Sequence, residues 1–126
     1  MSTKKQLGIW MDHSEANLIE FNNEVAKTTA TIQNTFDHND MESALNRSEE
    51  LMHNKRQQHQ TAYYKKLEDV IILNNEVILF GPTDAKKELL NMLRTDLRFK
   101  DIKIEVESAD KMSENQKHAF VKTYFS

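Results

Sequence analysis

Acidic side chains near the ends of expected helices and strands are the first candidates for chemistry in this chain of 126 residues. Several carboxylates around two metal ions would make a nuclease site. The candidate ligands follow expected strands or lie near the start of an expected helix, and they are Asp12, Asp84 and Glu49 or Glu50. Because the chain has 20 acidic residues, a few acids at such positions are a weak indication. We favour turn and cap roles for Asp12 and Asp84, so a metal-dependent nuclease is our third functional hypothesis.

Histidine and serine offer no clearer reactive group. The five histidines include no pair four residues apart, which is the spacing that a zinc site on a helix often uses. Ser14 follows His13 without an oxyanion-binding loop, so we assign it to a turn. The absence of cysteine excludes a thiolate nucleophile, a thiolate zinc site and a disulfide framework. We therefore expect no metal, no cofactor and no catalytic residue.

The segment Gly81-Pro82-Thr83 lies between an expected strand and an expected helix. Free N–H groups at a helix N-terminus can hold an anion, so this junction is a candidate anion site. The chain has no Gly-rich loop or phosphate-binding lysine pattern there. We favour a purely structural role, in which the glycine and proline end the strand.

A basic stretch in an otherwise acidic protein is the stronger candidate binding site. The chain has 17 basic and 20 acidic residues, so its net charge of −3 does not attract nucleic acid over the whole surface. Residues 51–60, however, contain no acidic residue. Such a stretch is either a solvated helix face or a contact with RNA phosphates, whose affinity would depend on salt. The candidate RNA-binding residues are Arg47, Lys55, Arg56, His59 and Lys65.

Five strands and three helices must position these residues. Apolar patterns predict strands at residues 7–11, 16–21, 77–80 and 102–107, and a high content of β-branched residues predicts a strand at 24–32. Tight turns join the first three strands, which predicts an antiparallel meander with residues 24–32 at one edge. Residues 33–42 are expected to form an exposed loop.

The expected helices cover residues 42–70, 83–95 and 113–125. The first is amphipathic, with Ala62, Tyr63 and Leu67 among the positions expected to face the core. Its middle or N-terminal half should be more solvated. Thr83 is expected to cap the second helix, and Ser113 to Gln116 matches a capping box.

The order of elements is therefore β-β-β-α-β-α-β-α. Right-handed crossovers after the meander place the last two strands parallel to the first. This predicts an α/β fold with a five-stranded mixed sheet of order 3-2-1-4-5, which is a ribonuclease-H-like arrangement. The continuous run 77–80 should be an interior strand covered on both faces.

Three segments resemble the central domain of archaeal and eukaryotic class 1 peptide-release factors and of Pelota. Val77 to Leu89 resembles a strand that ends in glycine and is followed by a helix beginning with an acidic or small residue and then lysine. Lys55 to Lys66 is similar to the basic helix that precedes this strand. Gly8 to Asp12, with Glu15-Ala16, resembles the opening hairpin of that domain.

One departure from the family pattern concerns catalysis. In release factors, the loop after the third strand carries Gly-Gly-Gln, which promotes hydrolysis of peptidyl-tRNA. The corresponding stretch here, Gln33 to Arg47, contains no glycine, and the family's flanking domains are not in this sequence. The resemblance therefore implies a stand-alone, noncatalytic relative that is closer in this respect to Pelota.

The leading hypothesis is a single domain over residues 1–126 that binds the ribosome or tRNA-like RNA without catalysis. The alternative is a protein-interaction or regulatory domain that does not bind RNA. No DNA partner is expected, and nothing in the sequence points to a particular oligomeric state. The charged N-terminus is unlike a signal peptide, and no run approaches the roughly 18 apolar residues of a membrane span. We therefore expect a cytoplasmic protein.

Overall fold

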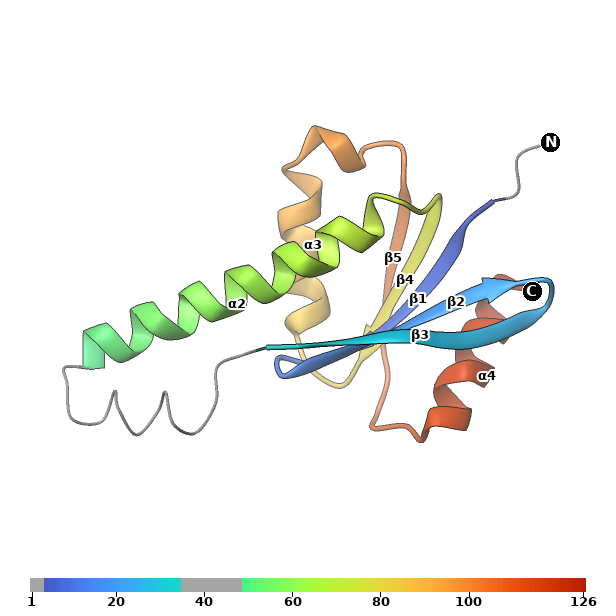
Figure 1. Cartoon of the computed structure of the whole chain (residues 1–126), viewed down its shortest axis with the longest axis horizontal. Helices are drawn as coiled ribbons and strands as arrows, with labels where there is room; N and C mark the ends of the chain where they lie inside the picture. The colour runs from blue at the N-terminus through green and yellow to red at the C-terminus, as the bar shows by residue number, and fades with distance from the viewer. Residues whose placement is uncertain (1–3, 35–48) are drawn as a thin grey trace.

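Five strands form one mixed sheet in the computed structural model, which describes residues 4–34 and 49–126, except for the side chains of 49–56. Each strand begins and ends within one residue of its predicted position: β1 (Gln6–Met11), β2 (Glu15–Asn22), β3 (Val25–Gln33), β4 (Glu76–Gly81) and β5 (Lys103–Ser108). Their order is β3-β2-β1-β4-β5, as predicted. β1 is antiparallel to β2 and parallel to β4, and β5 is parallel to β4. The expected ribonuclease-H-like arrangement is confirmed (Figure 1).

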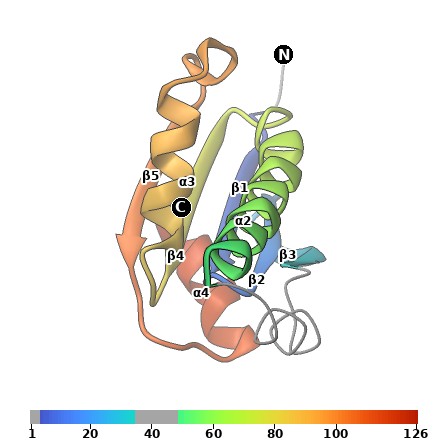
Figure 2. The same ribbon diagram turned by 90° about the vertical axis from the view of Figure 1, so that its left-hand side faces the viewer.

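The helices cover the two faces of the sheet unequally. α2 (Glu49–Ile71) and α3 (Ala85–Arg94) lie on one face, and α4 (Glu114–Phe125) lies on the other (Figures 1 and 2). A short 3₁₀ helix, η1 (Leu97–Phe99), follows α3 and was not predicted from the sequence. The start of the predicted long helix and most of the predicted loop before it lie outside the described residues. No helix in the described part of the chain is long and apolar enough to cross a membrane.

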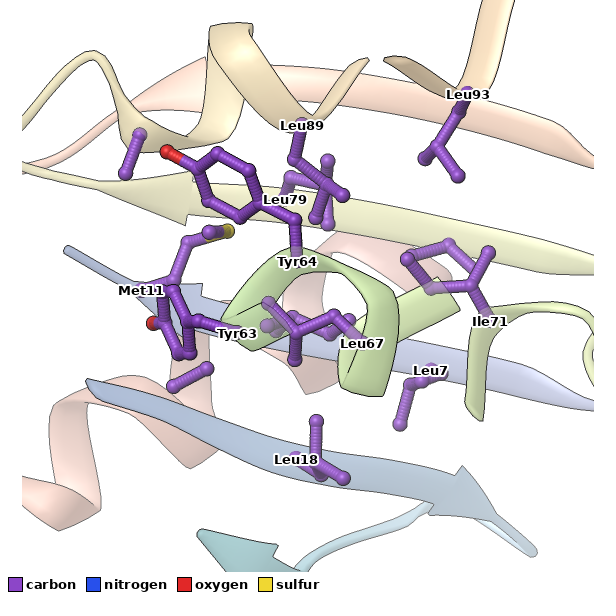
Figure 3. Close-up of a cluster of buried hydrophobic side chains, with 14 of the residues drawn as sticks. Leu7, Met11, Leu18, Tyr63, Tyr64, Leu67, Ile71, Leu79, Leu89 and Leu93 are labelled. Atoms are coloured by element: carbon purple, nitrogen blue, oxygen red, sulfur yellow. The ribbon is translucent and has the colours of Figure 1, made fainter. Parts of the chain in front are cut away.

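Alternation along the strands builds a core on each face of the sheet. In β1, Leu7, Ile9 and Met11 face α2 and α3, whereas Trp10 faces α4. In β4, Val77 and Leu79 face α2 and α3, whereas Ile78 and Phe80 face α4. Because both faces of β4 are covered, the strand is apolar without interruption. Figure 3 shows the larger core, whose labelled side chains are Leu7, Met11, Leu18, Tyr63, Tyr64, Leu67, Ile71, Leu79, Leu89 and Leu93.

The C-terminal half of α2 packs on this core in a register that differs slightly from the prediction. Tyr63, Tyr64 and Leu67 are buried, but Ala62 is exposed. The expectation that Ala62 faces the core was therefore wrong. Tyr64 is buried instead, and its hydroxyl donates a hydrogen bond to Glu88 of α3.

The N-termini of α3 and α4 are stabilised in different ways. The predicted capping box of α4 is confirmed, since Ser113 Oγ accepts from Gln116 N at 3.2 Å and Gln116 Oε1 accepts from Ser113 N at 2.8 Å. In α3 the N-cap position belongs to Asp84, and Thr83 Oγ1 only accepts from the Ala85 N–H at 3.3 Å. The prediction that Thr83 is the N-cap was therefore wrong by one residue.

Lys86, in the first turn of α3, is buried although it is charged. Its side chain is only 2% exposed, and its Nζ donates to the carbonyl oxygen of Thr83 at 2.5 Å. Burial lowers the pKa of Lys86, because removing an ammonium group from water disfavours its charged form. The lysine thus ties α3 to the segment that leaves β4.

Candidate functional site

The N-terminal half of α2 extends past the sheet. Figure 1 shows that the C-terminal half of α2 lies over the strands, whereas its N-terminal half continues beyond them. The acid-free stretch 51–60 lies mainly on this projecting half. A helix of 23 residues is roughly 35 Å long, whereas a strand of 6 residues spans roughly 20 Å. The projection follows from this difference in length.

The structure places most of the candidate RNA-binding residues along this one helix. Lys55 and Arg56 belong to its projecting half, although their side chains are not described, and Arg47 lies outside the described residues. His59 is half-buried, and Lys65 is exposed. The structure therefore supports a common helix for four of the five candidates, without bringing their described side chains into contact.

The exposed lysine Lys65 has no ion-pair partner in the described part of the chain, and neither has its neighbour Lys66. Lys65 does act on Glu68 at longer range. Burial and then the charge of Asp96 raise the pKa of Glu68, while Arg98 and Lys65 oppose that increase. Both lysine ammonium groups are therefore available to an anion in solution.

A groove of about 900 Å³ lies between α2 and α3, and both polar and apolar side-chain atoms line it. Its α2 side is rich in glutamine, whose amide can both donate and accept hydrogen bonds. Lys65, one of the predicted residues, lies on its rim. The lining residues are Gln57, Gln58, Gln60, Thr61, Ala62, Tyr64, Lys65, Glu88 and Met92.

A polar junction at this groove ties three elements together. Glu88 of α3 accepts a hydrogen bond from the Tyr64 hydroxyl at 2.6 Å, and its other carboxylate oxygen lies 3.1 Å from His13 Nε2. Beside it, the Tyr63 hydroxyl donates to the Asp12 carbonyl oxygen at 2.9 Å. Burial and then the Glu88 carboxylate raise the pKa of Tyr64, so its hydroxyl remains a hydrogen-bond donor. The junction fixes α2 against α3 and the β1–β2 turn.

Sequence reasoning missed this junction because its residues come from three distant segments. Glu88 is one of 20 acidic residues, and no local pattern distinguishes it from the others. The one available signal was the helical register of α3, which places Glu88 on the side of the helix that faces Tyr64. The contact also shows that the ring of His13 is directed to a carboxylate.

The acids considered as metal ligands have structural surroundings. Asp12 Oδ1 accepts from the backbone N–H groups of Ser14 and Glu15 at 2.7 and 2.8 Å, which confirms its turn role and that of Ser14. The Asp84 side chain is 77% exposed and lies 3.7 Å from Lys87 Nζ. Across residues 4–34 and 57–126, no group of three or more histidine and acidic side chains could hold a metal ion.

Among known proteins, solved structures match this chain in fold. No family model matches the sequence, and no curated protein matches it. Among solved structures, Pelota of Thermoplasma acidophilum matches with a TM-score of 0.61 and 13% identity over 94% of this chain. Pelota of Archaeoglobus fulgidus matches with a TM-score of 0.57 and 12% identity over 98% of it. The archaeal translation termination factor aRF1 matches with a TM-score of 0.58 and 11% identity over 94% of it.

These matches define the class of protein by its fold. The chain corresponds to 32% of each Pelota chain and 34% of the aRF1 chain, so it spans about a third of their length. It is an α/β domain with the fold of a domain-sized segment of Pelota and aRF1. The fold that the sequence resemblance implied is therefore confirmed.

Proposed function

We propose that this chain is a noncatalytic, translation-related domain that binds the ribosome or tRNA-like RNA through α2. The observation that carries the proposal is the position of the acid-free stretch 51–60, mainly on the part of α2 that extends past the sheet. A projecting helix can reach a large partner without a clash from the rest of the domain. The proposal of a translation-related role is also supported by the fold that the chain shares with a domain-sized segment of the translation termination factor aRF1.

The chemistry of this helix suits a phosphate backbone. Lysine and arginine neutralise phosphates and release their counterions, which gives affinity without sequence specificity. Gln57 and Gln58 are exposed next to the basic residues, and amides commonly contact phosphate and sugar oxygens. The net charge of −3 elsewhere opposes binding by other surfaces, so the contact should be confined to α2.

Reversing Arg47, Lys55 and Arg56 to glutamate is expected to weaken association with ribosomes by about tenfold or more at low salt. The wild-type chain should also dissociate steeply as salt increases, because each phosphate contact releases a counterion. The measurement is sedimentation of the tagged chain with purified ribosomes across a salt series.

The matched control reverses Lys27, Lys100 and Lys122, which are exposed and lie outside α2. Both variants change the net charge equally, so only the position of the charges differs. Each should unfold close to the wild-type denaturant midpoint, because surface substitutions change stability little. Equal binding by the α2 variant and the wild type would contradict the proposal, as would no sedimentation of the wild type at low salt. A protein-interaction domain would then be the better hypothesis.

The noncatalytic part of the proposal predicts that the chain releases no peptide from ribosomes that carry labelled peptidyl-tRNA. The stretch 33–47 has no glycine, so it lacks the backbone freedom of a Gly-Gly-Gln turn. Peptide release should equal that in buffer, with or without a stop codon. Puromycin added to the same ribosomes is the positive control, and release by the chain above the buffer rate would show that it is catalytic.

A further inference from the structure

The face of the sheet that carries α4 is only partly covered. α4 packs on β1, β2 and β3, whereas β5 lies at the far edge of the sheet (Figure 1). A groove of about 510 Å³ runs between α4 and β5. It is lined by Glu107, Met112, Gln116, Ala119, Phe120, Thr123 and Tyr124. We call it the α4–β5 groove.

One wall of the α4–β5 groove is formed by aromatic side chains of α4 that pack against other aromatic rings. The Phe120 ring stacks on the buried Phe80 ring with 4.2 Å between their centroids. Tyr124 packs edge-to-face against Phe125 at 5.1 Å. Phe120 and Tyr124 are each half-buried, so part of each ring stays open to solvent. The wall therefore offers a fixed apolar surface.

Glu107 of β5 forms the other wall, and Glu105 and the exposed Lys103 lie further along the same face of that strand. Glu105 and Glu107 of β5 are exposed, and they pair in register with Ile78 and Phe80 of β4, so they face the α4 side. Neither glutamate has an ion-pair partner among the described residues. Glu76, on the same face, instead lies 3.2 Å from Lys4 Nζ.

The glutamates of this face affect the pKa of Tyr124 in the aromatic wall. Burial raises the pKa of Tyr124, and the charges of Glu105, Glu107 and Glu76 raise it further. The Tyr124 hydroxyl therefore lies in a negative field. Charged side chains on an edge strand can serve only to prevent edge-to-edge aggregation. That role explains the charges of β5, but it does not explain why they border an open aromatic groove.

We propose that the α4–β5 groove binds an arginine-bearing segment of a protein partner, with the guanidinium between the Tyr124 ring and the carboxylates of Glu105 and Glu107. A guanidinium stacks on an aromatic face and donates paired hydrogen bonds to a carboxylate, so arginine matches both walls. An apolar neighbour of the arginine would contact Phe120 and Met112. The groove is on the opposite face of the sheet from α2, so this proposal does not depend on RNA binding.

The test is an NMR titration of the ¹⁵N-labelled chain with synthetic peptides. The peptides carry a central Arg-Leu-Arg, Lys-Leu-Lys or Glu-Leu-Glu in a glycine–serine frame. The arginine peptide should bind most tightly and shift the amide signals of β5 and α4. The double variant Glu105→Lys and Glu107→Lys should bind it about tenfold or more weakly. A control variant, Glu20→Lys and Asp69→Lys, makes the same charge change at exposed positions elsewhere and should retain binding.

Tyr124→Leu separates stacking from charge. This variant should lose the preference for arginine over lysine, because the ring face that a guanidinium stacks on is gone. Equal binding of the arginine and glutamate peptides would overturn the proposal. It would also be overturned if the control variant lost as much affinity as the double variant, or if the shifted signals mapped outside the groove. Self-association of the chain that the double variant abolishes would assign the groove to a second copy and would equally overturn it.

Discussion

Replacing Gly81 with alanine is expected to destabilise the protein by roughly 3 kcal/mol or more. Gly81 has a φ of 153°, a backbone conformation that L side chains rarely adopt. A Cβ atom at this position would lie 2.0 Å from the carbonyl oxygen of Met11 in β1. Both the strain and the clash involve the backbone, so no rotamer change can relieve them. Denaturant unfolding, compared at equal m values, measures the loss.

Gly8 provides the matched comparison. A Cβ atom at Gly8 would lie 2.3 Å from Cγ2 of Val121, which is a side-chain atom of α4. Gly8→Ala should therefore be partly rescued by Val121→Ala, with a coupling energy of about 1 kcal/mol or more. Met11→Ala should not rescue Gly81→Ala, because it leaves the Met11 carbonyl in place. An unfolding midpoint for Gly81→Ala close to that of the wild type would show that this junction tolerates a side chain.

Leu79→Ala is expected to cost about 2–5 kcal/mol, the usual range for emptying a buried leucine site. Leu79 is 0% exposed, and it lies on β4 between β1 and β5, beneath α2 and α3. The cavity cannot easily collapse because strands flank it on both sides. The free energy of unfolding from denaturant melts is the measurement.

Two further substitutions test whether the loss at Leu79 arises from its burial. Leu97→Ala removes the same atoms from a side chain that is 82% exposed, so it should change stability by less than about 0.5 kcal/mol. Asp12→Ala removes the acceptor of two backbone N–H groups in a half-buried turn, which should cost about 1 kcal/mol. A larger loss for Asp12→Ala than for Leu79→Ala would contradict the places assigned to both residues.

The two proposed surfaces depend on different parts of the fold. The direction of α2 is fixed at its C-terminal half by the junction of Tyr64, Glu88 and His13. The α4–β5 groove depends on α4 and the edge strand β5. Because they lie on opposite faces of the sheet, an RNA and a protein partner could bind at the same time.

Local patterns in the sequence predicted the elements and their order. Apolar patterns identified four of the strands, and the β-branched residues of 24–32 identified β3, since both signals depend only on local sequence. Right-handed crossovers then predicted the order 3-2-1-4-5 for a meander followed by two βα units, and the structure has that order. The basic stretch 51–60 was also visible, because it requires only composition and helical spacing.

Only the tertiary structure decided which polar side chains meet. Lys117 donates to Asn17 Oδ1 at 2.6 Å and lies 3.9 Å from the Trp10 ring centroid, although these residues are far apart in the sequence. Buried Lys86 and the Tyr64–Glu88 pair likewise depend on how helices and strands come together. The α4–β5 groove exists because α4 alone cannot cover a face of five strands, so the part of that face near β5 is left open. Such contacts and grooves form between segments that are distant in the sequence. Local sequence patterns do not show how closely those segments pack.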